Sequence, residues 1–173
     1  MIEHDRIVAI DPGIRNLGIA EIQDGQLVRA ALIRNPVKSG NDLAAVRAIS
    51  RAARDWLGGK LFLTHLAIEV PRVYGAGHQK GDQSDLIALA TVCGAVAESC
   101  SMSSTQVIRY FPQDWKGQVD ADVMTARILS RLSLAETRAI EKCPASLLHN
   151  VIDAIGIGLK VVGRMEPIRV YPR

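Results

Sequence analysis

Cysteine and aromatic residues are scarce in this chain, and long hydrophobic runs are missing. The three cysteines, Cys93, Cys100 and Cys143, are odd in number and show no C-x-x-C spacing, so we interpret them as buried thiols without a zinc or redox function. The longest nearly unbroken apolar stretch, residues 86–97, is about half of the ~20 residues that a bilayer-spanning helix needs. Residues 1–6 lack the form of a signal peptide. We therefore expect no membrane association and a cytoplasmic protein, in the host cytoplasm if it is viral.

Repeats and low-complexity tracts are also absent, and the proportions of hydrophobic (48%) and charged (23%) residues are ordinary for a globular protein. A length of 173 residues suits one domain. We therefore expect a single domain over residues 1–173, with about 164–173 as an extended C-terminal tail. A net charge of +3 permits nucleic-acid binding but is too small to indicate it alone.

The order of apolar segments and turn signals predicts alternating strands and helices. Three strands come first, and their short connections make them an antiparallel meander. The fourth strand is reached through a helix, so it must lie parallel to an earlier strand. Together these elements predict an α/β fold in which a mixed sheet has helices on both faces. The predicted strands are 6–10, 17–22, 27–34, 61–70 and 106–110, and the predicted helices run from the Asn41 cap to Gly58 and over 83–99, 120–132 and 146–162.

Acidic side chains stand in three apolar segments. Asp11 closes the run 7–10, Glu69 closes the run 66–68, and Asp153 lies in the last predicted helix. A buried carboxylate without compensation costs several kcal/mol, so each of these acids needs a cation, hydrogen bonds or solvent. In mixed sheets of this kind, ligands bind at the carboxyl ends of strands, where Asp11 and Glu69 both fall. If their strands are neighbours, about 5 Å separates the strand axes, and the two carboxylates can share a Mg²⁺ ion.

Three blocks of sequence resemble the active-site blocks of RuvC-like Holliday junction resolvases, within the ribonuclease H-like superfamily. Residues 10–20 read IDPGIRNLGIA, residues 67–69 read AIE, and Asp153 is followed by Ala154. The resemblance spans nearly the whole chain in order and spacing, and a phage-type member of the family is one interpretation of it. It implies a ribonuclease H-like mixed five-stranded sheet and a crossover junction endodeoxyribonuclease that cuts four-way DNA junctions by paired symmetric nicks.

The same resemblance implies hydrolysis of a phosphodiester by two Mg²⁺ ions about 4 Å apart, with Mn²⁺ as an alternative. One ion would activate water, and the other would stabilise the departing oxygen. By similarity, Asp11 would bridge both metals, while Glu69 and Asp153 would each hold one.

The last block departs from the family pattern. The family usually has a second ligand, Asp or His, three residues before the final Asp, and here that position is Asn150. His149 lies four residues before Asp153, and both offsets fall on the same helical face as Asp153. Asn150 would be a neutral and weaker ligand, whereas His149 would carry a proton near the leaving group. We favour Asn150 as the metal ligand and keep both as candidate catalytic residues.

Basic residues near these blocks are candidates for DNA contact. Residues 112–116 read PQDWK and resemble the family's Pro-x-x-Val-Lys block, which implies that Lys116 contacts the phosphate near the metals; an ordinary surface charge is the alternative. The loop 72–82, directly after Glu69, is long enough to suggest a function. In it, Tyr74 would either stack on an opened base or pack on the loop itself. The candidate DNA-binding residues are Arg15, Arg72, Tyr74, His78, Lys80 and Lys116.

Each acidic residue also has a structural explanation. Asp11 could start a turn, and Asp153 could be a solvated helix residue. Glu69 could pair with Arg72. Against a solvated Asp153, apolar residues flank it, and the glycines at 156 and 158 would weaken a helix unless they allowed close packing. The sequence therefore predicts that this helix is pressed against the sheet.

Other functions share parts of this pattern. Relatives of RuvC that process ribosomal RNA have a similar first block, so a nuclease for structured RNA, or for other branched DNA, is the main alternative. An ATP-binding domain of the actin and sugar-kinase type would need a second homologous domain, for which this chain has no room, so we expect no nucleotide cofactor. A DNA-binding scaffold without activity would need a lost carboxylate. Resolving a symmetric junction requires paired nicks, so we expect a homodimer.

Overall fold

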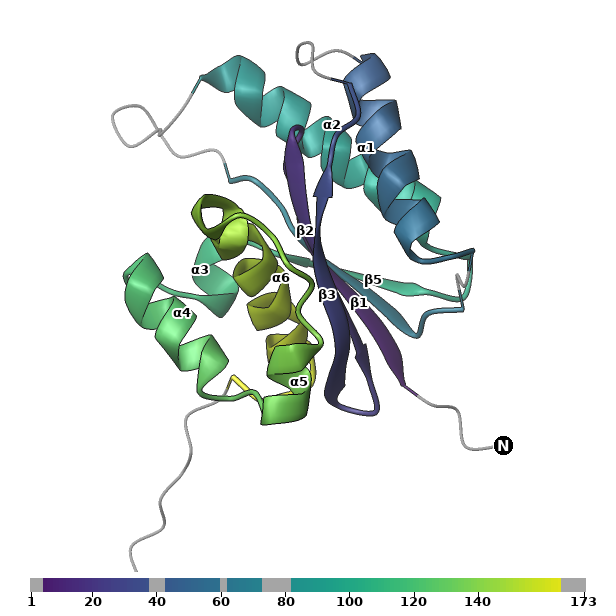
Figure 1. Ribbon diagram of the computed structural model, residues 1–173. Helices are drawn as coiled ribbons and strands as arrows, with labels where there is room; N and C mark the ends of the chain where they lie inside the picture. The colour runs from purple at the N-terminus through teal and green to yellow at the C-terminus, as the bar shows by residue number, and fades with distance from the viewer. Residues whose placement is uncertain (1–4, 38–42, 60–61, 73–81, 166–173) are drawn as a thin grey trace, which may run out of the picture.

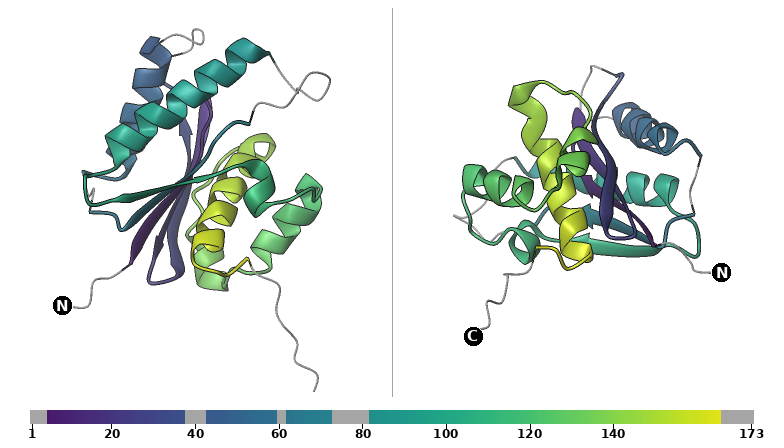
Figure 2. Two further views of the ribbon diagram at one scale, coloured as in Figure 1. Left: turned by 180° about the vertical axis from the view of Figure 1, so that it is seen from behind. Right: turned by 60° about the horizontal axis from the view of Figure 1, so that its bottom comes forward.

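The computed structural model describes residues 5–37, 43–59, 62–72 and 82–165. Its centre is a five-stranded sheet with the strand order β3-β2-β1-β4-β5. Helices α1 and α2 cover one face of the sheet, and α3 to α6 cover the other (Figures 1 and 2). The strands are β1 (Arg6–Asp11), β2 (Asn16–Gln23), β3 (Gln26–Arg34), β4 (His65–Glu69) and β5 (Gln106–Tyr110). The helices are α1 (Leu43–Trp56), α2 (Gln83–Cys100), α3 (Pro112–Trp115), α4 (Ala121–Leu129), α5 (Leu134–Arg138) and α6 (Leu148–Val161), with a 3-10 turn at Ala145–Leu147.

Strand pairing confirms the predicted mixed sheet. The first three strands pair antiparallel as a meander, and β4 and β5 then add parallel to β1 on its other side. Because β1 lies in the middle, its side chains alternate between two hydrophobic cores. Ile7 and Ala9 face the core beneath α6, while Val8 and Ile10 face the core beneath α1 and α2. A strand buried on both faces explains the unbroken apolar run that precedes Asp11.

Helix α6 is pressed against the sheet, as the glycines in its sequence predicted. A Cβ added at Gly158 would lie 2.6 Å from Ile22 Cδ1 and 3.2 Å from Ala9 Cβ, so a larger residue would displace the Ile22 side chain and crowd the strands. Gly18 in β2 provides the matching gap on the sheet side, because a Cβ there would overlap the backbone carbonyl of Asn150. The two glycines therefore set how closely α6 approaches the sheet.

Gly18→Ala is expected to destabilise the protein by roughly 3 kcal/mol, because the new methyl group meets backbone that cannot move aside without shifting α6. Urea unfolding followed by circular dichroism measures this change. Gly94→Ala in α2 is the matched control: its added Cβ meets open space, and replacing glycine within a helix should stabilise by about 0.5–1 kcal/mol. Equal unfolding midpoints for the two variants would contradict the proposed close approach.

The structure differs from the sequence-based expectation in the shorter elements. The expected strand over 61–70 is confined to His65–Glu69, and residue 61 lies outside the described residues. The expected helix over 120–132 ends at Leu129 and is followed by the separate short helix α5. Helix α5 begins with a capping box, in which Ser133 and Glu136 bond to each other's backbone. Glu136 also accepts from the Leu27 backbone and from Arg164, which holds its pKa at about 2.

Cys93 and Cys100 are buried as predicted, whereas Cys143 is only partly buried, and burial raises the pKa of Cys93 to about 12. Met165, at the expected start of the C-terminal tail, is buried in the core beneath α6, and residues 166–173 lie outside the described part of the chain. Among the described residues, no helix combines the length and apolar composition that crossing a bilayer requires.

Candidate metal centre

Three structural elements bring the predicted carboxylates to one edge of the sheet. Asp11 ends β1, and Glu69 ends the neighbouring parallel strand β4. Asp11 lies opposite Gly18 in the antiparallel register, and Gly18 in turn lies against the backbone of Asn150. Because Asp153 follows Asn150 by about one turn of α6, this close approach brings the third carboxylate to the ends of the two strands.

The acids are close enough to disturb one another's ionisation. Burial, followed by repulsion from Glu69 and Asp153, raises the pKa of Asp11 well above its ordinary value. Burial also raises the pKa of Glu69, although Lys116 and Trp115 counteract it. Such mutual repulsion among carboxylates is typical of sites that receive cations.

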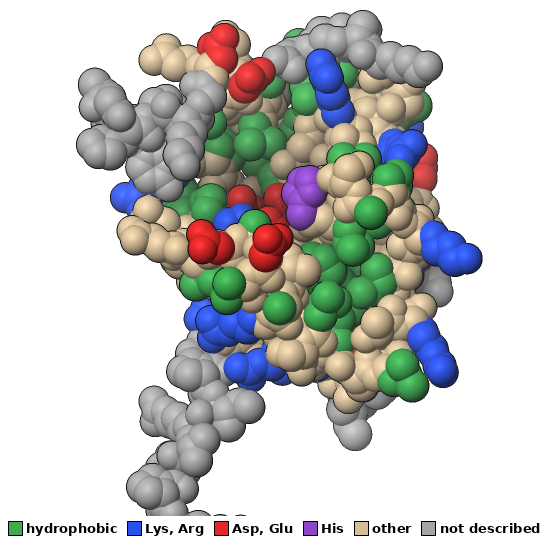
Figure 3. Space-filling model, turned by 60° about the vertical axis from the view of Figure 1, so that its left-hand side comes forward, with side chains coloured by type: hydrophobic (Ala, Val, Ile, Leu, Met, Phe, Trp, Pro, Cys, Tyr) green, Lys and Arg blue, Asp and Glu red, His purple; other side chains and the backbone are tan. Residues whose placement is uncertain are grey.

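Lys116 supplies the positive charge at this cluster. The residue follows the last turn of α3, and its Nζ lies 3.0 Å from Asp153 Oδ2 and 3.5 Å from Glu69 Oε2. Burial alone would lower the pKa of Lys116, but the carboxylates of Glu69 and Asp153 raise it. The ammonium group therefore stays protonated and neutralises part of the negative charge. On the face shown in Figure 3, acidic side chains gather in a hollow around a basic one, with a histidine beside them.

Trp115 is a member of this site that the sequence analysis did not assign. Its indole Nε1 donates a hydrogen bond of 2.6 Å to Glu69 Oε2, and the ring is buried. The Lys116 Nζ lies 4.8 Å from the centre of the same ring. One signal was available in the sequence: in a chain with 4% aromatic residues, a tryptophan occupies the position where the family's Pro-x-x-Val-Lys block has valine.

The donor chemistry of the site fits Mg²⁺, since its three carboxylates offer the hard oxygen ligands that this ion prefers. In the described part of the chain, however, no three His, Cys, Asp or Glu side chains converge closely enough to hold one ion as they stand. The Lys116 ammonium lies against both Glu69 and Asp153 and supplies the counter-charge in this structure. An ion bound here would therefore share or replace the role of that ammonium as counter-charge.

The two alternatives for a fourth ligand occupy different environments. Asn150 is partly buried, and its Nδ2 donates a 3.2 Å hydrogen bond to the Leu147 carbonyl at the start of α6. His149 is exposed. This arrangement directs the Asn150 amide nitrogen toward its own helix, and the choice between the two residues stays a prediction.

The expected DNA-binding residues are partly described. Arg15 is exposed at the end of the connection from β1 to β2, and Arg72 is exposed just after β4. Arg72 donates a 3.2 Å hydrogen bond to Gln113, and its guanidinium lies 5.5 Å from the ring centre of Phe111. Arg109, which the sequence analysis did not single out, lies 5.7 Å from the same ring. Tyr74, His78 and Lys80 fall outside the described residues.

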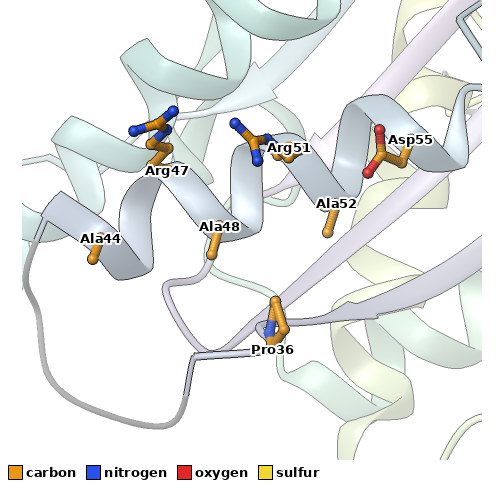
Figure 4. A pocket seen from close by; sticks show the side chains of 7 residues that line it. All are labelled: Pro36, Ala44, Arg47, Ala48, Arg51, Ala52 and Asp55. Carbon is orange, nitrogen blue, oxygen red and sulfur yellow. The ribbon is translucent and has the colours of Figure 1, made fainter.

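A separate shallow pocket lies on the outer side of α1 (Figure 4). Two arginines, Arg47 and Arg51, lie one turn apart along it, and the acidic Asp55 also lines it. It contains none of the predicted catalytic or DNA-binding residues. The acid cluster at the strand ends is therefore the stronger candidate for chemistry.

Comparison with known proteins yields matches in structure only. No protein-family model and no curated protein sequence matches the chain. RuvC of Thermus thermophilus, solved in complex with a Holliday junction substrate, superposes with a TM-score of 0.62 at 19% identity, over 94% of this chain and 96% of that one. A second Thermus thermophilus RuvC structure gives a TM-score of 0.61 at 16% identity, over 92% and 96% of the two chains. The protein described here therefore has the ribonuclease H-like fold of RuvC.

Proposed function

We propose that the protein is a Mg²⁺-dependent, structure-selective endonuclease that resolves four-way DNA junctions by paired symmetric nicks. The observation that carries this proposal is the gathering of Asp11, Glu69 and Asp153 at one edge of a sheet with the fold of RuvC. The raised pKa of Asp11 supports it, because a carboxylate surrounded by other carboxylates gains most from a bound cation.

Each residue of the cluster has a distinct part in the proposed reaction. Two Mg²⁺ ions, when bound, would supply an activated water and stabilisation of the departing oxygen. Asp11, which interacts electrostatically with both other acids, would help to hold both ions, while Glu69 and Asp153 would each hold one. Lys116 would turn from the carboxylates toward the scissile phosphate, where its positive charge stabilises the developing negative charge. Asn150 or His149 would complete the site from the first turn of α6.

Contacts with DNA would extend from this cluster along the ends of β1 and β4. Arg15 and Arg72 are exposed at those two strand ends and would bind backbone phosphates. Phe111, flanked by Arg72 and Arg109, places an aromatic ring beside this basic surface. Tyr74, His78 and Lys80 remain proposed contacts in the loop that follows.

A cleavage comparison tests the proposed substrate. Four-way DNA junctions, duplex DNA of the same sequence and structured RNA are incubated with the protein in Mg²⁺ and, separately, in EDTA. We expect Mg²⁺-dependent paired nicks at symmetric positions of the junction and little cutting of the duplex. Preferential cutting of RNA would instead support the alternative, a RuvC-related nuclease for ribosomal RNA processing.

We also propose a homodimer, because two symmetric nicks require two equivalent sites related by a two-fold axis. Light scattering at micromolar concentration should give the mass of two chains of 18.8 kDa for the free protein. With a junction bound, it should give the mass of two chains plus that of the DNA. A monomer in both conditions would contradict this proposal.

A further inference from the structure

The Glu69 carboxylate is held through one of its two oxygens. Trp115 Nε1 donates to Oε2 at 2.6 Å, and Lys116 Nζ lies 3.5 Å from the same oxygen. A hydrogen bond to a carboxylate at this distance is short and charge-assisted, so it restrains the position of Oε2 and with it the orientation of the group. Both of these donors address Oε2, so an ion held by Glu69 would be met by Oε1.

We propose that Trp115 is a positioning residue that orients the Glu69 carboxylate for metal binding. The inference rests on the function proposed above and adds a residue to its site. The protein would use the indole much as metalloproteins use outer hydrogen-bond partners, which orient a ligand without touching the metal.

The indole is itself fixed by packing. Trp115 is 6% exposed, and its ring lies against α6 at Gly156, where an added Cβ would come within 2.5 Å of Cζ3. Ile128 of α4 closes the same space at 2.7 Å from that Cβ position. Gly156 follows Asp153 by three residues, so α6 provides both a carboxylate of the cluster and the space for the ring.

An indole suits this role chemically. Its N–H can donate but cannot accept, so it does not compete with the carboxylates for a cation. It is also uncharged, so it orients Glu69 without cancelling the negative charge that an ion needs. Lys116, which does carry charge, is free to exchange its carboxylate contacts for phosphate without releasing Glu69.

Replacing Trp115 by phenylalanine tests the inference, because the ring is largely kept and the donor is lost. We expect Trp115→Phe to weaken Mg²⁺ and Mn²⁺ binding, measured by calorimetry without DNA, by about tenfold or more. The melting temperature in EDTA, measured in parallel, reports any loss of packing. Unchanged metal affinity in a folded Trp115→Phe protein would overturn the inference.

The chain contains a matched control. Trp56, the other of the two tryptophans, also donates to a glutamate, Glu141, at 3.0 Å, but far from the carboxylate cluster. Trp56→Phe should leave metal affinity unchanged. If both variants lost affinity equally, the effect would be one of general stability, and the positioning role would be rejected.

A second measurement keeps Trp115 in place and so does not depend on the folding of its variant. In the Trp56→Phe protein, Trp115 is the only tryptophan, and we expect Mn²⁺ to change its fluorescence with the midpoint found by calorimetry. Adding Glu69→Gln should abolish this response. Metal binding without a fluorescence response would overturn the positioning role alone, whereas no metal binding by the wild type at millimolar concentrations would reject the proposed function together with it.

Discussion

Asp11→Asn, Glu69→Gln and Asp153→Asn are each expected to lower the rate of junction cleavage by on the order of 10³ or more, which corresponds to about 4 kcal/mol of activation free energy. Each change keeps the shape of the side chain but removes the negative charge that would hold a metal ion at the reacting phosphate. The rate is measured under single-turnover conditions on a labelled four-way junction in Mg²⁺.

Junction affinity should change little in these variants, because basic residues and phosphate contacts supply most of it. Asp55→Asn is the matched control, since Asp55 is an exposed acid on α1 away from the cluster. Its cleavage rate should equal that of the wild type. Near-wild-type cleavage by Asp11→Asn, Glu69→Gln or Asp153→Asn would remove that residue from the proposed site.

In the absence of metal, Asp11→Asn is expected to make the protein more stable. The folded state raises the pKa of Asp11, so it binds the proton more tightly than the unfolded chain does. Metal-free stability should therefore fall as pH rises from about 4, near the ordinary pKa of an aspartate, through the raised value in the folded protein. At neutral pH the amide removes this penalty, and each kcal/mol gained should raise the melting temperature by roughly 2–4 °C.

Thermal unfolding in EDTA at several pH values checks this expectation, with Asp55→Asn again as the control. Mg²⁺ should restore the lost stability to the wild type, by about 2.7 kcal/mol at a concentration 100 times its dissociation constant, and should not do so for Asp11→Asn. A lower melting temperature for Asp11→Asn in EDTA would show that Asp11 stabilises the fold, as expected of a residue that only starts a turn.

The central sheet was predictable because its signals are local. A continuous apolar run such as residues 7–10 indicates a strand buried on both faces, and an intervening helix forces β4 to lie parallel to β1. The glycines of α6 also carried information, since a helix tolerates them only where another element comes close. The positions of Asp11 and Glu69 at neighbouring strand ends follow from these features.

The remaining details of the site depend on tertiary contacts that leave little trace in the sequence. Helix α3 has only four residues, and its position brings Trp115 and Lys116 onto the same oxygen of Glu69. No periodicity predicts so short a helix, and a lysine near an acid can equally be an ordinary surface charge. For the same reason, the sequence suggested Arg72 as a partner of Glu69 and gave no indication of Trp115 or Lys116 in that role.

The most direct test of the account is a crystal structure of the protein soaked in Mn²⁺, with anomalous scattering used to locate the ions. We predict two peaks about 4 Å apart, both in contact with Asp11, one also with Glu69 and the other with Asp153. The peak in contact with Asp153 would also show whether Asn150 or His149, on the same helix, is the fourth protein ligand. Absence of ions from this edge of the sheet, or carboxylates that point away from one another when Mn²⁺ is bound elsewhere, would contradict the proposed metal centre.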